Sequence, residues 1–197
     1  MAEYRESREF LHLAGSLGLL ALHGGRIEPG TEEIARFVSS RSRASLYVYS
    51  GQRPARNRDL HRPSQNMEID SWPLVLQFLS HVNTVISIHG HGRNLSCAYV
   101  GGLNQRMVQR FIELLGPALP GYEWISDPDC IPRAIRGCDP RNVVNLPPAR
   151  GMQLELPRTL RQTKPTSRGE FYEPAGEALI LSGLLIEFVG KVMDSDS

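Results

Sequence analysis

The sequence lacks an apolar run long enough to cross a membrane. No stretch of its 197 residues approaches the ~20 apolar residues that a transmembrane helix needs. The apolar stretch 17–22 is too short, and lies too close to Glu3, Glu6 and Glu9, to be the core of a signal peptide. We therefore expect a soluble, cytoplasmic protein without a membrane partner.

Cysteine and net charge are also scarce. The three cysteines, Cys97, Cys130 and Cys138, are irregularly spaced and form neither a disulfide framework nor a Cys-x-x-Cys metal site, which favours a reducing compartment. The formal charge of +1 lacks the basic excess typical of a general nucleic-acid binder. The turn at 101–104 lacks the full glycine pattern of a nucleotide-binding loop, so nucleotide binding is not expected either.

Hydrophobic residues, in contrast, make up 41% of the chain, enough to build one compact core. We find no internal repeat and no low-complexity boundary between domains. The sequence therefore predicts a single catalytic domain over 1–197, with its core motifs at about 17–162 and a C-terminal helix at about 175–193.

Predicted strands and helices alternate along the chain. Apolar β-rich runs predict buried strands at 17–22, 45–49, 84–88 and 97–100, and alternation predicts another at 151–156. Helices are expected after Thr31 as a cap, at Pro73 and after Asn104. Residues 52–68 and most of 116–150 are expected to form loops, with a short strand at 122–125. This order predicts an α/β fold with a mostly parallel or mixed central sheet flanked by helices.

Chemically versatile side chains follow these strands. His23 comes directly after the first buried strand, His89 directly after 84–88, and Glu155 near the end of 151–156. Ligands of such sheets bind outside the carboxyl ends of the strands. We therefore expect these three side chains to converge, although they lie far apart in the sequence.

The stretch ALHGGRIEPGTEE holds a second carboxylate, Glu28. Its five-residue separation from His23 does not suit one helix face but suits a loop that curls back, fixed by Pro29-Gly30. Two histidines and a carboxylate are a common ligand set for catalytic zinc, with one position left for water. Each residue also has a structural interpretation, as a hydrogen-bonded histidine or as a carboxylate at the start of a helix. His91 is an alternative ligand to His89.

Other residues near these motifs have two interpretations. Glu155 is either a general base beside a metal-bound water or part of a solvated strand face. Arg150, Arg158 and Arg161 either bind an anionic substrate through their guanidinium groups or are ordinary surface charges. His61 either reaches the site from its loop or lies in solvent.

Taken together and in order, the motifs resemble one known family. HGGRIEPGTEEIA, SLYVYSG, LHRPS, VISIHGHG, YVGGLN and GMQLELPRTLR are similar to segments of the poly-γ-glutamate hydrolases of bacteria and their phages. The resemblance runs from about residue 19 to residue 161. It implies a fold like that of the zinc carboxypeptidases, Zn²⁺ as the cofactor, hydrolysis of γ-glutamyl amide bonds, and an anionic γ-glutamyl polymer or a small molecule as the substrate.

The resemblance also implies roles for individual residues. It makes His23, Glu28 and His89 the metal ligands and Glu155 the catalytic residue, and it places His61 near the substrate.

The sequence departs from the family in two ways. The Asn-Arg pair expected before QLE is replaced by the run 142–150, in which the arginine is either displaced to Arg150 or absent. The extra His91 could alter the ligand set or bind substrate, and Arg150 and Arg161 could also bind substrate. Two alternatives to a γ-glutamyl hydrolase therefore remain: a non-catalytic binding protein with the same fold, and an amidase that acts on another small acyl-amino acid.

Overall fold

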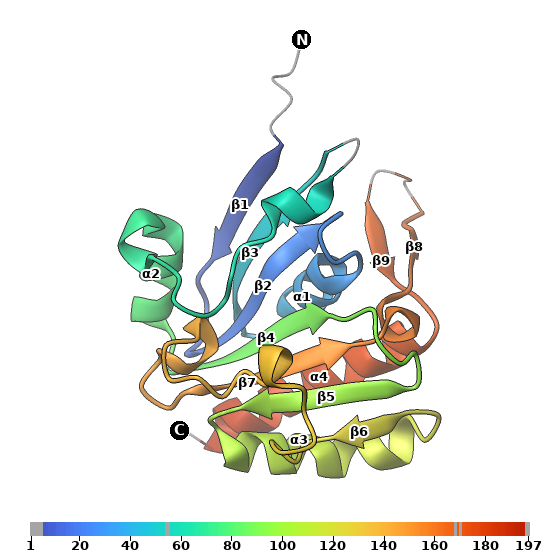
Figure 1. Cartoon of the computed structure of the whole chain (residues 1–197). Helices are drawn as coiled ribbons and strands as arrows, with labels where there is room; N and C mark the ends of the chain where they lie inside the picture. The colour runs from blue at the N-terminus through green and yellow to red at the C-terminus, as the bar shows by residue number, and fades with distance from the viewer. Residues whose placement is uncertain (1–5, 54–55, 168, 170, 196–197) are drawn as a thin grey trace.

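The core of the computed structural model is a seven-stranded sheet (Figure 1). The structure describes residues 6–53, 56–167, 169 and 171–195. The strand order across the sheet is β1-β3-β2-β4-β7-β5-β6. The bounds are β1 (Ser7–His12), β2 (Leu17–Gly25), β3 (Ser45–Gly51), β4 (Thr84–Gly90), β5 (Cys97–Gly102), β6 (Glu123–Ile125) and β7 (Gly151–Leu156). A separate antiparallel pair consists of β8 (Thr163–Pro165) and β9 (Tyr172–Pro174).

The four central strands run in the same direction. β2 pairs in parallel with both β3 and β4, and β4 pairs in parallel with β7. β1 is antiparallel to β3, and β5 is antiparallel to β7. The carboxyl ends of β3, β2, β4 and β7 therefore share one edge of the sheet, where the predicted fold class places a ligand. The predicted mixed α/β sheet is confirmed.

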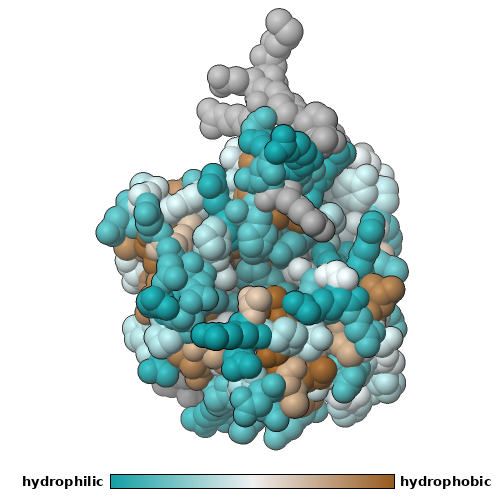
Figure 2. Space-filling model, in the orientation of Figure 1, coloured by the Kyte–Doolittle hydropathy of each residue, from teal (hydrophilic) through white to brown (hydrophobic). Residues whose placement is uncertain are grey.

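Helices cover both faces of the sheet, and the two faces differ. The helices are α1 (Thr31–Ser39), α2 (Pro73–His81), α3 (Gln105–Ala118) and α4 (Glu177–Ser195). α1, α3 and α4 pack on one face in the larger apolar cluster, while α2 packs on the other face in a smaller one. The outer surface in the view of Figure 2 is largely hydrophilic, with apolar groups in small separate patches. No helix among the described residues is long and apolar enough to cross a membrane.

Most predicted elements are present, with three corrections. β1 was not predicted, and it ends at His12. α1 is capped by Gly30, whose φ of 96° suits glycine, so the prediction that Thr31 is the cap is wrong. The carboxylate of Glu33 accepts the Gly30 amide hydrogen bond at 3.1 Å. β2 also extends through His23 to Gly25 instead of ending before the histidine.

A β-bulge in β2 helps to aim His23. Ala21 is level with Val48 and Gly24 with Ser50, so that two residues of β2 lie opposite one residue of β3. Such a bulge interrupts the alternation of side chains between the two faces. As a consequence His23 lies on the same face as His89 of β4 instead of among the apolar residues that contact α1 and α4.

Candidate functional site

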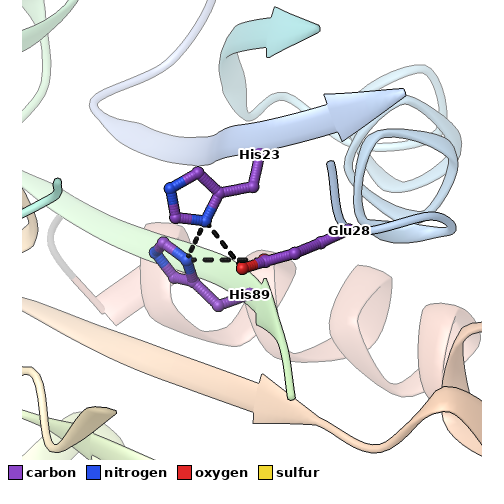
Figure 3. A group of neighbouring side chains, drawn as sticks. All are labelled: His23, Glu28 and His89. Atoms are coloured by element: carbon purple, nitrogen blue, oxygen red, sulfur yellow. Dashed lines mark hydrogen bonds and ion pairs between the residues drawn. The ribbon is translucent and has the colours of Figure 1, made fainter. Parts of the chain in front are cut away.

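Three side chains from two strands and one loop meet at the carboxyl edge of the sheet (Figure 3). His23, Glu28 and His89 offer ligand atoms that all lie within 4.8 Å of one another. Nδ1 of His23 lies 2.9 Å from Oε1 of Glu28 and 3.0 Å from Nδ1 of His89. Nδ1 of His89 lies 3.7 Å from Oε2 of Glu28. Nδ1 of each imidazole and the carboxylate of Glu28 therefore point at a common centre.

The ring of His23 is held by the backbone of a distant loop. Nε2 of His23 lies 2.7 Å from the carbonyl oxygen of Arg62, and because a carbonyl only accepts, Nε2 must carry the hydrogen. In the neutral ring, Nδ1 then presents a lone pair to the carboxylate of Glu28. Two electron-rich atoms at 2.9 Å are stable only with a positive species between them, which is either a proton or a metal cation.

His89 is oriented in a similar way from within its own strand. Its Nε2 lies 2.9 Å from the hydroxyl of Ser87, two residues earlier and therefore on the same face of β4. Both residues are buried. Outer partners of this kind fix the ring orientation of metal-binding histidines. The donor set, two imidazoles and a carboxylate with held outer nitrogens, fits a zinc ion.

Glu28 reaches the centre because the loop after β2 curls back. The amide of Glu28 donates to the carbonyl of His23 at 2.8 Å, and its Oε2 accepts the amide hydrogen bond of Gly90 at 2.7 Å. Burial alone would raise the pKa of Glu28, but the imidazoles of His23 and His89 outweigh burial and hold that pKa well below its usual range. The carboxylate is therefore charged, as a metal ligand must be.

Glu155 lies beside this group, on β7. Its Cα is the sheet partner of His89, and its side chain is buried rather than part of a solvated face. Oε1 of Glu155 accepts a hydrogen bond from Nε2 of Gln153 at 2.9 Å. Burial, followed by the charge of Glu28, raises the pKa of Glu155 to about 8. Such a carboxyl group can both take up and release a proton near neutral pH.

Arg161 supplies a buried positive charge at the same edge. Its Nε donates to the carbonyl of Leu156 at 3.1 Å, and its Nη1 donates to the carbonyl of Pro29. The guanidinium fills the space over Gly90, where any Cβ would overlap it. Arg161 forms no ion pair within the described part of the chain, although the charges of Glu28 and Glu155 act on it. This fixed positive charge, which lacks a directly paired carboxylate in that part of the chain, favours a negatively charged group nearby.

His61 also lies at the site. Its ring stacks on that of His23 with centroids 3.8 Å apart, and its Nε2 lies 3.8 Å from Oε1 of Glu28. Burial, followed by the charge of His23, lowers the pKa of His61. The next residue, Arg62, anchors this loop because its guanidinium lies 5.4 Å from the centroid of the Trp72 ring. The half-exposed imidazole therefore forms one wall of the site.

Two predicted residues are not available as expected. Arg150 precedes β7, and its carbonyl accepts a hydrogen bond from Thr84 at the start of β4. It therefore lies at the opposite end of the strand from Glu155, and the expectation that it lies beside the site is wrong. Both ring nitrogens of His91 are bonded to backbone atoms, of Cys97 at 3.0 Å and of Arg93 at 3.2 Å. His91 stabilises its loop and leaves no ring nitrogen for a metal or a substrate.

Some contributors to the site escaped sequence reasoning. The carbonyl of Arg62 is a backbone group, so no side chain in the sequence indicates its contact with His23. Ser87 could have been found, because it lies two residues before His89 in a strand and so shares its face. Gln153 could also have been found, because it lies two residues before Glu155 in its strand and so shares its face.

Comparisons with known proteins show which family the chain is similar to. The family described as poly-gamma-glutamate hydrolase matches residues 4–168 of the chain. The SPbeta prophage-derived UPF0714 protein YoqZ of Bacillus subtilis strain 168 is 31% identical over 146 residues, which are 74% of this chain and 50% of YoqZ. UPF0714 protein YndL of the same strain is 32% identical over 127 residues, 64% of this chain and 47% of YndL. The chain thus spans about half the length of these two relatives.

Solved structures share the fold over almost the whole chain. A bacteriophage poly-gamma-glutamate hydrolase superposes with a TM-score of 0.79 at 23% identity, covering 97% of this chain and 92% of that one. A zinc-free form of YndL gives a TM-score of 0.78 at 22% identity, with 95% and 91% covered. A metallo-carboxypeptidase from Burkholderia cenocepacia gives 0.57 at 12% identity, with 94% and 58% covered. The expected likeness to the carboxypeptidase fold is confirmed.

Proposed function

The chain belongs to the poly-γ-glutamate hydrolase family, and from this premise we propose that it is a zinc-dependent amidohydrolase that cleaves γ-glutamyl amide bonds. Poly-γ-glutamate is the first candidate substrate. One observation carries the proposal: two imidazoles and a charged carboxylate converge within 4.8 Å. Glu155, a fourth ionisable group with a different task, lies next to them.

The proposed metal ligands are Nδ1 of His23, Nδ1 of His89 and the carboxylate of Glu28. This is the donor set of catalytic zinc sites with three protein ligands. Zinc in such a site polarises a carbonyl oxygen and lowers the pKa of bound water to near neutrality. The buried hydrogen bonds of His23 and His89 to the Arg62 carbonyl and the Ser87 hydroxyl prepare both rings for this task.

Glu155 is the proposed general base and acid. Its carboxylate takes a proton from the attacking water molecule and later delivers that proton to the nitrogen of the leaving amine. Proton transfer of this kind contributes ~10²- to 10⁴-fold to the rate. The hydrogen bond from Gln153 leaves the second carboxylate oxygen, Oε2, for the water molecule.

Arg161 is the proposed stabiliser of the charge that develops on the substrate. Negative charge grows on the amide oxygen during attack, and a preorganised cation nearby stabilises that charge without having to move. The hydrogen bonds of Arg161 to the carbonyls of Leu156 and Pro29 fix its position before the substrate arrives.

The test combines metal analysis with a small set of substrates. The protein is purified without added zinc, its metal content is measured, and hydrolysis of γ-glutamyl, α-glutamyl and formyl-amino-acid substrates is compared. We expect about one zinc ion per chain and cleavage of the γ-glutamyl substrate. A stably folded, metal-free and inactive protein would instead be a binding protein. Cleavage of the formyl substrate alone would indicate an amidase of different specificity.

A further inference from the structure

Two exposed arginines flank the buried Arg161, and neither has a role in the chemistry above. Arg93 lies three residues beyond the end of β4, and Arg158 lies two residues beyond the end of β7. These are the strands that carry His89 and Glu155. Both arginines therefore extend from the edge of the sheet where the candidate site lies.

The two segments that carry these arginines are tied together. The carbonyl of Leu156 accepts hydrogen bonds from the amide of His91 at 3.0 Å and from Nε of Arg161 at 3.1 Å. The hydroxyl of Thr159 donates to the carbonyl of Leu95 at 2.9 Å. The turn after β4 and the turn after β7 thus form one surface, which carries Arg93, Arg158 and Arg161.

The positive charges on this surface are not neutralised within the described residues. Arg36 and Arg53, in contrast, pair with the carboxylates of Glu32 and Glu6, whereas Arg93, Arg158 and Arg161 form no ion pair with any described carboxylate. Burial lowers the pKa of Arg161, the charges of Glu28 and Glu155 oppose that effect, and the charge of Arg158 adds to it. Like charges held close together without a counter-ion are unfavourable, so an anion from outside would stabilise this cluster.

We propose that Arg93 and Arg158 form a subsite for a free carboxylate next to the scissile bond, by which the enzyme distinguishes γ-linked from α-linked glutamyl chains. The inference rests on the proposed function. In a γ-linked chain, the residue that supplies the amide nitrogen carries a free carboxylate on the adjacent carbon. In an α-linked chain that carbonyl belongs to the next neutral amide. The guanidinium groups carried by the turns that follow the strands of His89 and Glu155 match the first arrangement, because guanidinium binds carboxylate in a bidentate way.

The subsite can be tested with two substrates that differ only in this group. One is a γ-linked glutamyl oligomer with free α-carboxylates, and the other is the same oligomer with its α-carboxylates converted to carboxamides. For the zinc-loaded wild-type protein we expect kcat/KM to be at least about tenfold higher for the free acid, the size typical of a charge-assisted hydrogen bond. In the double variant Arg93→Ala/Arg158→Ala this ratio should fall close to one.

The matched control is Arg110→Ala. Arg110 is also an exposed arginine, but it lies on α3, which packs on the opposite face of the sheet. Its variant should keep the wild-type ratio, and thermal unfolding should show that all three proteins are folded. A double variant that keeps the wild-type preference would overturn the subsite, as would a wild-type protein that cleaves both substrates equally while remaining an active amidase. A wild-type protein that cleaves neither substrate would overturn the proposed function and the subsite with it.

Discussion

Glu155, the proposed general base, lies in an environment that disfavours its charged form. A buried carboxyl group normally needs a cation or several donors to remain charged. Among the described residues Glu155 accepts one hydrogen bond, from Gln153, and the charged Glu28 lies close enough to oppose its ionisation. Departures of this kind from local optimisation are expected at functional sites.

Replacing Glu155 by Gln should separate metal binding from turnover. Gln keeps the shape of the side chain and can still accept the hydrogen bond from Gln153, but it cannot exchange a proton with water. We expect the variant to retain its zinc and to lose roughly 10²- to 10⁴-fold in kcat. Metal analysis and initial rates on the same preparation would check both statements. A variant with wild-type turnover would remove Glu155 from the mechanism.

The same substitution should stabilise the metal-free protein at alkaline pH. The folded-state pKa of about 8 exceeds the unfolded value of 4.5, so the wild-type protein binds more protons when folded and loses stability as pH rises between these values. Glu155→Gln removes this loss. With chelator present, its free energy of unfolding should exceed that of the wild type at pH 8, but not at pH 4, by on the order of a few kcal/mol. Denaturant titrations at both pH values measure this, and a difference independent of pH would contradict it.

At the scale of elements, the turn after β4 couples a glycine to the buried cation. A Cβ at Gly90 would overlap the guanidinium of Arg161, whereas a Cβ at Gly92 would have nothing within 4 Å. Gly90→Ala should therefore displace Arg161 while leaving zinc content unchanged, and kcat should fall by roughly 10²-fold. Gly92→Ala is the matched control and should behave like the wild type. Equal activity of the two variants would show that the position of Arg161 does not matter for turnover.

The sequence was most informative for buried elements. Central strands such as β2 and β4 are continuous apolar runs, because helices or loops cover both of their faces. β1 escaped prediction because it is an edge strand with mostly exposed side chains and no apolar run. The opposite direction of β5 also escaped, since strand direction follows from connections and packing rather than from composition.

The position of a candidate site residue could be predicted from the sequence where that residue follows a buried strand. His23, His89 and Glu155 could be placed together because parallel strands end at one edge. Arg150 was misplaced by the same reasoning, because it precedes its strand and so lies at the other end. The bulge that turns His23 and the Arg62 carbonyl that holds its ring depend on tertiary contacts, and no local pattern encodes them.

At the scale of the whole molecule, stability and function occupy opposite faces of one sheet. The larger apolar cluster joins α1, α3 and α4 to the sheet on one side. The proposed metal ligands and Glu155 lie on the other side, where loops and 3₁₀ turns supply much of the cover. Burial of the larger apolar cluster stabilises the fold enough to offset the cost of buried charges and of lone pairs that repel one another. A cation that relieves this repulsion should therefore stabilise the entire fold.

Zinc should raise the melting temperature of the protein. A ligand that binds only the folded state at 100 times its Kd stabilises that state by about 2.7 kcal/mol. For a chain of this size, such a gain corresponds to an increase in Tm of roughly 5–10 °C. Thermal unfolding with chelator, and again after zinc is restored, measures the shift. His23→Ala removes one ligand and should abolish most of the response, whereas Gly92→Ala, which leaves the ligands intact, should keep it. A wild-type Tm that is the same with chelator and with zinc would contradict a zinc site formed by His23, Glu28 and His89.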